Sequence, residues 1–187
     1  MHVIFLDIDG VLNCERDARQ LDAQHKQLGH TATDPTGACF YRQIDREAVE
    51  RVNRIAAATS AKIVVSSTWR KLMDLQELLL ILTAHGLTTE IIGATPNGYA
   101  EPGLRALYGH PERLSRGYEI DYWLRQHPAV DRFVILDDGS DMVMHTNRLV
   151  QTDCEEGLCD EHVELAIRVL AWDGVSLPSP FDTFGAT

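Results

Sequence analysis

Acidic residues follow two apolar runs of this chain, and hydroxyl residues follow a third. The acids are Asp7 and Asp9 after residues 3–6, and Asp137, Asp138 and Asp141 after residues 133–136. The hydroxyls are Ser66, Ser67 and Thr68, after residues 63–65. A single Asp after a strand is commonly a helix N-cap or a solvated turn residue. Carboxylates that converge repel one another unless a cation neutralises them, and magnesium prefers such hard oxygen ligands. The set therefore predicts a Mg²⁺ ion bound by Asp7, Asp9 and one or both of Asp137 and Asp138.

Strand and helix patterns that alternate along the chain must position these residues. Short apolar runs predict strands at residues 2–7, 61–67, 88–94, 131–139 and 147–153. Helical spacing of apolar residues predicts helices over 44–60, 75–86, 118–128 and from about Asp160 onward. This order indicates an α/β fold, a Rossmann-like three-layer sandwich with a mostly parallel sheet and helices on both faces. Ligands of such sheets bind at the carboxyl ends of the strands, where the acids and hydroxyls are expected.

Several residues fix the expected orientation of these helices. Asp45 is the expected N-cap of the first helix and Gly86 the stop of the second. The residues expected to face inward are Val49, Val52, Ile55 and Ala56, then Leu75, Leu78, Leu79 and Leu82, then Ile120, Trp123 and Leu124, and finally Val163, Ala166, Ile167 and Leu170.

The sequence predicts one domain, residues 1–172, with three irregular parts. Residues 14–44 are a polar insert, residues 93–115 are rich in Gly and Pro and predict a long loop, and residues 173–187 form an irregular tail. A length of 187 residues, with 44% hydrophobic and 24% charged residues, suits one soluble domain with a sizeable core.

Composition narrows the function classes. No apolar stretch is long enough to cross a bilayer, and the N-terminus lacks a signal-peptide pattern, so we expect a cytoplasmic protein with no membrane partner. The net charge of −11 argues against broad, non-specific binding to duplex nucleic acid, although a local basic patch is compatible with it. The four cysteines form no CxxC pair, and we interpret them as free thiols.

Four motifs in order resemble those of the haloacid dehalogenase (HAD) superfamily. They are "FLDIDGVLN" with its DxD, "IVVSST" with a hydroxyl at a strand end, Arg116 at the start of a helix, and the acidic "VILDDGSD". They span residues 2–141, and each falls at a predicted strand end or helix start. An acid at position 9 is typical of the phosphate-transferring branch. The family more often has Lys where this chain has Arg116.

The resemblance implies a magnesium-dependent phosphohydrolase that works through an aspartyl-phosphate. Asp7 would be the nucleophile. Asp9 would protonate the leaving oxygen and then accept a proton from water, and its backbone carbonyl would contact the metal. Ser66 would donate a hydrogen bond to the phosphate, with Ser67 the less favoured choice. Arg116 would pair with the phosphate and with Asp7.

Four further residues of these motifs are candidates for lesser roles. Gly10 would let the chain turn beside the bound phosphate. Arg70 is either a substrate contact or a surface arginine at a helix start. Trp69 is expected to be core or rim rather than a platform on which a base stacks. Asp141 would orient the metal shell or cap the following helix.

Members of the superfamily select their substrates with inserted cap elements, so the size of the insertions in this chain bears on the substrate class. Neither residues 14–44 nor residues 93–115 are long enough for a full cap domain, so the chain resembles a capless or minimal-cap member with an open site. Further motifs over residues 64–158, among them "VVSSTWR", "RGYEIDYWL" and "LVQTDCEEGL", resemble the small HAD domain of bacterial and phage RNA-repair proteins. The expected partner is a phosphorylated substrate, with nucleic-acid ends or nucleotides as candidates. A non-catalytic binding or regulatory module and a phosphotransferase are the alternatives.

Overall fold

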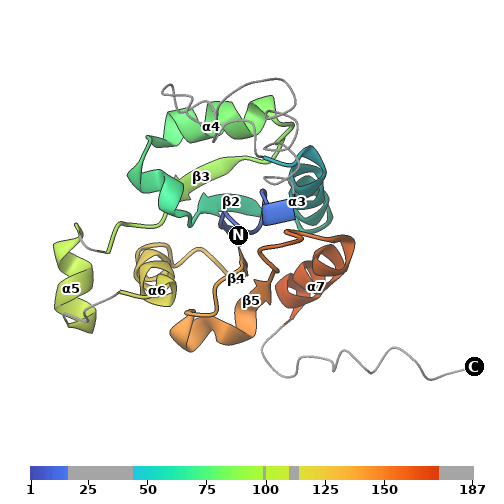
Figure 1. Cartoon of the computed structure of the whole chain (residues 1–187). Helices are drawn as coiled ribbons and strands as arrows, with labels where there is room; N and C mark the ends of the chain where they lie inside the picture. Colours follow the sequence, from blue (N-terminus) through green and yellow to red (C-terminus); the bar gives the residue numbers. More distant parts are fainter. Residues whose placement is uncertain (17–43, 99, 110–113, 173–187) are drawn as a thin grey trace, which may run out of the picture.

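The fold is built on a five-stranded parallel sheet. The structure, a computed structural model, describes residues 1–16, 44–98, 100–109 and 114–172. The strands are β1 (His2–Leu6), β2 (Lys62–Val65), β3 (Ile91–Ala94), β4 (Arg132–Asp137) and β5 (Leu149–Gln151). Their spatial order is β3-β2-β1-β4-β5, and every neighbouring pair is parallel (Figure 1). The α/β, Rossmann-like prediction is confirmed.

The register of the central strands brings three motif segments to one edge of the sheet. Leu6 of β1 pairs with Val65 of β2 on one side and with Leu136 of β4 on the other. The next residue of each strand, Asp7, Ser66 or Asp137, therefore emerges at the same carboxyl edge. The strand order also changes direction at β1, which is where open parallel sheets bind ligands.

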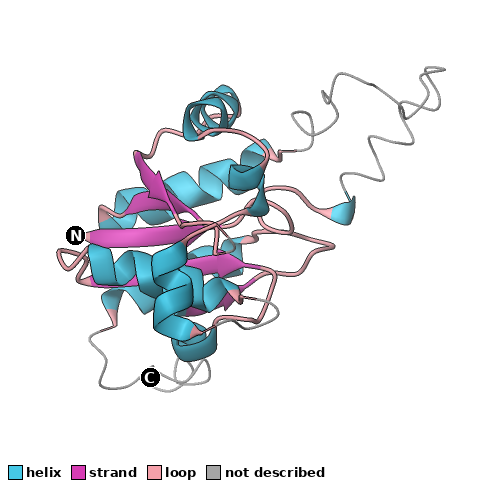
Figure 2. Cartoon of the chain, turned by 90° about the vertical axis from the view of Figure 1, so that its left-hand side faces the viewer, coloured by secondary structure: helices cyan, strands magenta, loops and turns pink. Residues whose placement is uncertain are grey.

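Helices cover both faces of the sheet, because each strand has apolar side chains on both sides. The side chains of Ile4 and Leu6 belong to one core, shared with α3 (Arg46–Thr59), α4 (Leu75–Ala84) and α7 (Asp160–Ala171). Val3 and Phe5 belong to the other core, which α6 (Arg116–Gln126) completes. Figure 2 shows the strands lying between these layers of helices.

The first and last predicted helices form as expected. The Asp45 side chain caps α3 by accepting a 2.8 Å hydrogen bond from the backbone N–H of Glu47. The predicted inward residues of α3, namely Val49, Val52, Ile55 and Ala56, are all buried. In α7, Val163, Ala166 and Leu170 are buried, while Ile167 is half-buried. Ile120 and Trp123 of α6 are also buried, and Leu124 packs against their core.

Two sequence-based predictions need correction. The predicted loop 93–115 contains a helix, α5 (Pro102–Tyr108). Its start is fixed by Pro102 in the first turn and by the Glu101 side chain, which accepts a hydrogen bond from Gly103 N–H, and buried Leu104 anchors it. In α4, Leu78 and Leu82 are buried as predicted, but Leu75 and Leu79 are 37% and 43% exposed. They lie beyond the narrow stripe through which α4 contacts the sheet.

Two 3₁₀ turns complete the described elements. The first, η1 (Thr68–Lys71), follows β2 directly, and the second, η2 (Val143–Arg148), follows β4. Most of the predicted 14–44 insert and all of the 173–187 tail lie outside the described residues, so the domain boundaries remain predictions. Among the described helices, none combines the length and the apolar character needed to cross a membrane.

Candidate active site

Three carboxylates converge at the carboxyl edge of β1 and β4. Each of Asp7, Asp137 and Asp138 offers an oxygen, and the three oxygens lie within 4.8 Å of one another. Asp7 is 5% exposed and Asp137 is 3% exposed, so two of the three are withdrawn from bulk water. Backbone hydrogen bonds fix the main chain of Asp7 and of Asp137. Asp7 N–H donates to Leu136 O at 2.9 Å, and Asp137 O accepts from Thr152 N–H at 3.1 Å.

Gly10 makes room for the third carboxylate. A Cβ at this position would lie 2.5 Å from Cγ of Asp138, and the φ angle of +71° is one that side-chain-bearing residues rarely adopt. Its carbonyl accepts a 2.7 Å hydrogen bond from the Thr152 hydroxyl, which holds the turn against the segment after β5. Gly10 therefore permits the approach of Asp138 to the site; its predicted contact with a phosphate remains a prediction.

Burial and mutual repulsion disfavour the ionised forms of the two inner carboxyls. Burial raises the pKa of Asp137 to about 7, with the charge of Asp7 adding to the effect and that of Arg116 opposing it. Burial likewise raises the pKa of Asp7, against the lowering effects of Arg116 and of a hydrogen bond from the Ser67 side chain. The raised pKa values mean that positive groups of the protein offset the negative charges of Asp7 and Asp137 only in part.

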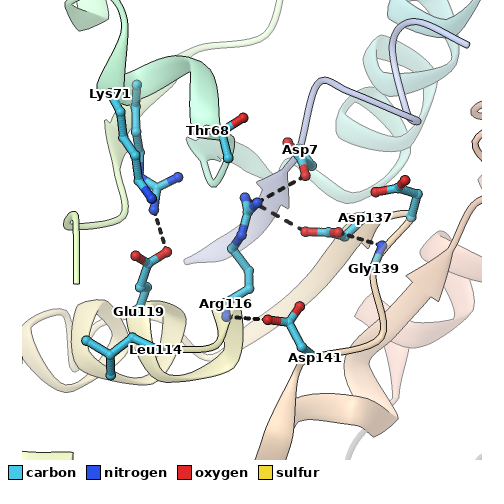
Figure 3. A pocket seen from close by; sticks show the side chains of 11 residues that line it. Asp7, Thr68, Lys71, Leu114, Arg116, Glu119, Asp137, Gly139 and Asp141 are labelled. Carbon is cyan, nitrogen blue, oxygen red and sulfur yellow. Dashed lines mark hydrogen bonds and ion pairs between the residues drawn. The ribbon is translucent and has the colours of Figure 1, made fainter. Parts of the chain in front are cut away.

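Arg116 supplies part of the compensation from the first residue of α6. Its guanidinium lies 3.3 Å from a carboxylate oxygen of Asp7 and 3.9 Å from one of Asp137 (Figure 3). The Asp141 side chain accepts a 3.1 Å hydrogen bond from the backbone N–H of Arg116. It therefore caps α6, which precedes it in the chain, and not the following helix as predicted. At Gly117 a Cβ would lie 2.1 Å from the carbonyl oxygen of Met142, so only glycine lets α6 start this close to the loop.

The same residues leave a place for a cation. Oδ2 of Asp137 and Nη1 of Arg116 are buried and have no hydrogen-bond partner among the described residues. A buried carboxylate oxygen without a donor is costly, and it is costlier still beside two further carboxylates. Hard oxygen ligands of this kind suit a divalent cation, so the donor set of Asp7, Asp137 and Asp138 fits one.

The side chain of Asp9 lies outside this donor set and is held by other partners. Trp69 Nε1–H donates to both of its carboxylate oxygens, at 2.9 and 3.0 Å. The Asn13 amide donates to Oδ1 at 2.9 Å, and its own oxygen accepts from Gly10 N–H at 3.0 Å. The geometry therefore does not favour the Asp9 side chain as a metal ligand. The backbone carbonyl of Asp9 remains the predicted contact with the metal.

The hydroxyls after β2 divide between different partners. Ser66 is fully buried, and its hydroxyl lies 3.5 Å from that of Thr95. Ser67 is also fully buried, and its side chain is the one that hydrogen-bonds to Asp7. Thr68, the first residue of η1, lines the pocket. The phosphate contact predicted for Ser66, with Ser67 as the less favoured choice, thus remains a prediction.

Arg70 is not a surface arginine, and because it lines the pocket its contact with the substrate remains a prediction. Its side chain is 6% exposed and forms an ion pair with Glu119, which is equally buried. Its Nε–H donates to Thr95 O at 2.9 Å, and Glu119 accepts from Gly98 N–H at 2.9 Å. The pair joins η1, the segment after β3 and α6. Glu119 was missed by the sequence analysis, although its place one helical turn after Arg116 puts both on the same side of α6.

A pocket of about 240 Å³ opens over these groups (Figure 3). Its acidic lining residues are Asp7, Glu119, Asp137, Asp138 and Asp141. Basic and polar groups that line it as well are Thr68, Arg70, Lys71 and Arg116. A pocket with both acidic and basic groups suits a phosphate, because the basic groups can bind the phosphate while the acidic groups bind a cation that it shares.

Comparison with known proteins agrees with this geometry. Residues 3–163 match the family described as the HAD domain in Swiss Army Knife RNA repair proteins. The match covers most of the chain, including β2 to β5, all of β1 except His2, and every candidate site residue, so the chain belongs to this HAD family. No curated protein and no solved structure matches the chain. Membership of the family supports a phosphohydrolase-type function and an association with RNA repair.

Proposed function

We propose that this protein is a Mg²⁺-dependent phosphomonoester hydrolase that forms an aspartyl-phosphate on Asp7. The observation that carries the proposal is the buried Asp7 carboxylate, which lies 3.3 Å from Arg116 and has an oxygen within 4.8 Å of oxygens of Asp137 and Asp138. A structural ion pair between Arg116 and Asp7 alone would need neither the second and third carboxylates nor an Asp137 oxygen that lacks a hydrogen-bond donor.

The first half-reaction transfers the phosphoryl group to Asp7. A carboxylate oxygen of Asp7 forms a bond to phosphorus while the bond from phosphorus to the leaving oxygen breaks, and Asp9 gives that oxygen a proton. Attack by an anion on an anion is opposed by charge, and the Arg116 guanidinium offsets part of this repulsion. A bound Mg²⁺ would supply the remaining positive charge.

The second half-reaction restores the protein. A water molecule attacks phosphorus, its proton passes to Asp9, and the bond to Asp7 breaks to release inorganic phosphate. The hydrogen bond from Ser67 keeps the Asp7 side chain oriented through both steps. Ser66 or Thr68 would donate to the phosphate oxygens; Ser66 directly follows β2, and Thr68 lines the pocket.

The proposed substrates are phosphorylated nucleic-acid ends or nucleotides. The family's association with RNA repair supports this class. Lys71 and Thr68 at the rim of the pocket are groups that suit a phosphodiester chain next to the reacting end. The net charge of −11 means that such binding would depend on local contacts such as that of Lys71, and with so few cations its salt dependence would be shallow.

The test is hydrolysis of an aryl phosphate with and without Mg²⁺, by wild type and by Asp7→Asn. The exposed Glu164→Gln in α7 is a control with the same loss of charge far from the site. We expect Asp7→Asn to lose activity by at least about 10³-fold, because the nucleophile is gone, and Glu164→Gln to retain it. Equal activity of wild type and Asp7→Asn would refute the nucleophile.

Two further measurements address the alternatives. If product alcohol exceeds inorganic phosphate in the presence of an acceptor, the protein is a phosphotransferase. If wild type binds phosphate but turns over neither aryl phosphates nor phosphorylated oligonucleotides, the site is a binding module. Preference for 3′- or 5′-phosphorylated oligonucleotides over sugar phosphates would support the nucleic-acid assignment, and the absence of any preference would contradict it.

A further inference from the structure

The Asp9 carboxylate is held by a side chain that comes from a different strand end. Trp69 belongs to η1, after β2, whereas Asp9 follows β1. The single indole N–H lies 2.9 and 3.0 Å from the two carboxylate oxygens, so it is shared between them. Such a contact fixes the plane and direction of the carboxylate, not only its position.

Trp69 is itself rigidly placed. Its side chain is 2% exposed and packs in the core shared by α3, α4 and β1. Its backbone N–H donates to the Ser67 hydroxyl, and its carbonyl accepts from Leu72 N–H at 2.9 Å. A tryptophan fixed in this way cannot follow a moving partner, so Asp9 must come to the indole.

A second donor limits Asp9 from its own turn. The Asn13 amide donates to Oδ1 at 2.9 Å while its oxygen accepts from Gly10 N–H, which ties the residue to the turn that admits Asp138. Together the two donors keep the Asp9 side chain out of the carboxylate cluster of Asp7, Asp137 and Asp138. A carboxylate that joined that cluster would be a metal ligand and could no longer carry a proton to the leaving group.

We propose that Trp69 is a positioning residue, whose indole N–H holds Asp9 in the orientation from which it transfers a proton to the leaving oxygen. This inference rests on the proposed phosphohydrolase function. The proton leaves Asp9 as the bond between phosphorus and the leaving oxygen breaks, and the attacking water later returns one, so no further reactant is needed. Trp69 touches neither reacting atom and acts only through Asp9.

Leaving-group dependence separates this role from a purely structural one. An alkyl oxygen needs a proton as it leaves, whereas p-nitrophenolate leaves without one. Loss of a correctly oriented acid should therefore slow an alkyl phosphate more than an aryl phosphate. A change that only destabilises the fold or lowers the fraction of active protein reduces both rates by the same factor.

The experiment compares glycerol 2-phosphate with p-nitrophenyl phosphate in wild type and Trp69→Phe, with Mg²⁺ present. Phe keeps an aromatic ring in the core and removes the N–H. We expect kcat/KM for the alkyl phosphate to fall about tenfold and kcat/KM for the aryl phosphate to fall less than about threefold, because kcat/KM reports the half-reaction in which the leaving oxygen takes its proton. Trp123→Phe is the matched control, because Trp123 is a buried tryptophan of the opposite core that stacks on His127.

A second replacement removes the N–H without leaving a cavity. Benzothienylalanine at position 69 has sulfur in place of the indole N–H and nearly the same shape, so it should fold even if Trp69→Phe does not. We expect it to show the same change in the alkyl-to-aryl ratio as Trp69→Phe, while Trp123→Phe leaves the ratio unchanged.

The outcomes distinguish this inference from the function on which it rests. If wild type hydrolyses both substrates and the position-69 replacements change the two kcat/KM values by equal factors, the positioning role of Trp69 is overturned and the phosphohydrolase stands. If Trp123→Phe changes the ratio as much as Trp69→Phe, the effect is structural and the inference again fails. If wild type hydrolyses neither these two substrates nor phosphorylated oligonucleotides, the proposed function fails and the inference falls with it.

Discussion

Asp137→Asn should stabilise the metal-free protein at neutral and alkaline pH, although it removes a residue of the site. Asn keeps an oxygen that can accept the 2.8 Å hydrogen bond from Gly139 N–H, so the local turn has no reason to change. It removes a negative charge that is buried beside Asp7 and only partly compensated by Arg116. The native fold carries this charge at a cost unless a cation is bound.

The size and sign of the effect follow from the pKa. The pKa of Asp137 rises from 3.8 to about 7 on folding. Between these two pH values the folded chain holds a proton that the unfolded chain has lost, so wild-type stability falls as pH rises. At about 1.4 kcal/mol per tenfold change in the ionisation equilibrium, the loss amounts to about 4 kcal/mol and is complete above about pH 7. Asn has no such titration.

The assay is urea unfolding in excess chelator from pH 4 to pH 8.5, followed by the same series with Mg²⁺. We expect the free energy of unfolding of Asp137→Asn to gain about 4 kcal/mol on wild type between the ends of this range. The exposed-acid variant Glu164→Gln should track wild type throughout. Added Mg²⁺ should stabilise wild type and have much less effect on Asp137→Asn. A gain below about 1 kcal/mol would refute the claim that burial of this carboxylate is uncompensated.

Two other changes test how the arginines of the site are held. Gly117→Ala forces a Cβ to within 2.1 Å of the Met142 carbonyl oxygen. We therefore expect the free energy of unfolding to fall by about 1–3 kcal/mol and kcat to fall strongly. The control is Gly93→Ala, whose Cβ would meet nothing closer than 3.8 Å. A wild-type kcat in Gly117→Ala would count against the need for a close start of α6. Glu119→Gln leaves the buried Arg70 charge without its partner, so the free energy of unfolding in urea should fall by about 3 kcal/mol. An unchanged urea midpoint would show that the backbone carbonyls bonded to Arg70 are enough to stabilise its charge.

The carboxylates of the site could be predicted because their signal is local in the sequence. Apolar runs that end in acids define strands and their carboxyl ends, and the parallel register of β1 with β4 then places Asp7 beside Asp137. Arg116 could be assigned only through the family resemblance, since a single arginine at a helix start carries little information by itself.

The contacts that hold these groups could not be predicted, because they depend on distances between segments far apart in the chain. Trp69 meets Asp9 across 60 residues, and Arg70 meets Glu119 across 49. Neither pair has a spacing that a sequence pattern can reveal. Helix α5 was not predicted because its seven residues include a Pro and a Gly, which are typical of loops, and only one leucine that is buried.

The most direct test of the central claim is to look for the phosphoryl group on Asp7 itself. Wild type would be mixed with an aryl phosphate and Mg²⁺, quenched with acid within the first turnover, digested and analysed by mass spectrometry. We expect a phosphoryl adduct on the peptide that carries Asp7, sensitive to hydroxylamine as an acyl phosphate is, and absent from Asp7→Asn. Turnover without any adduct, or an adduct on another residue, would contradict the account.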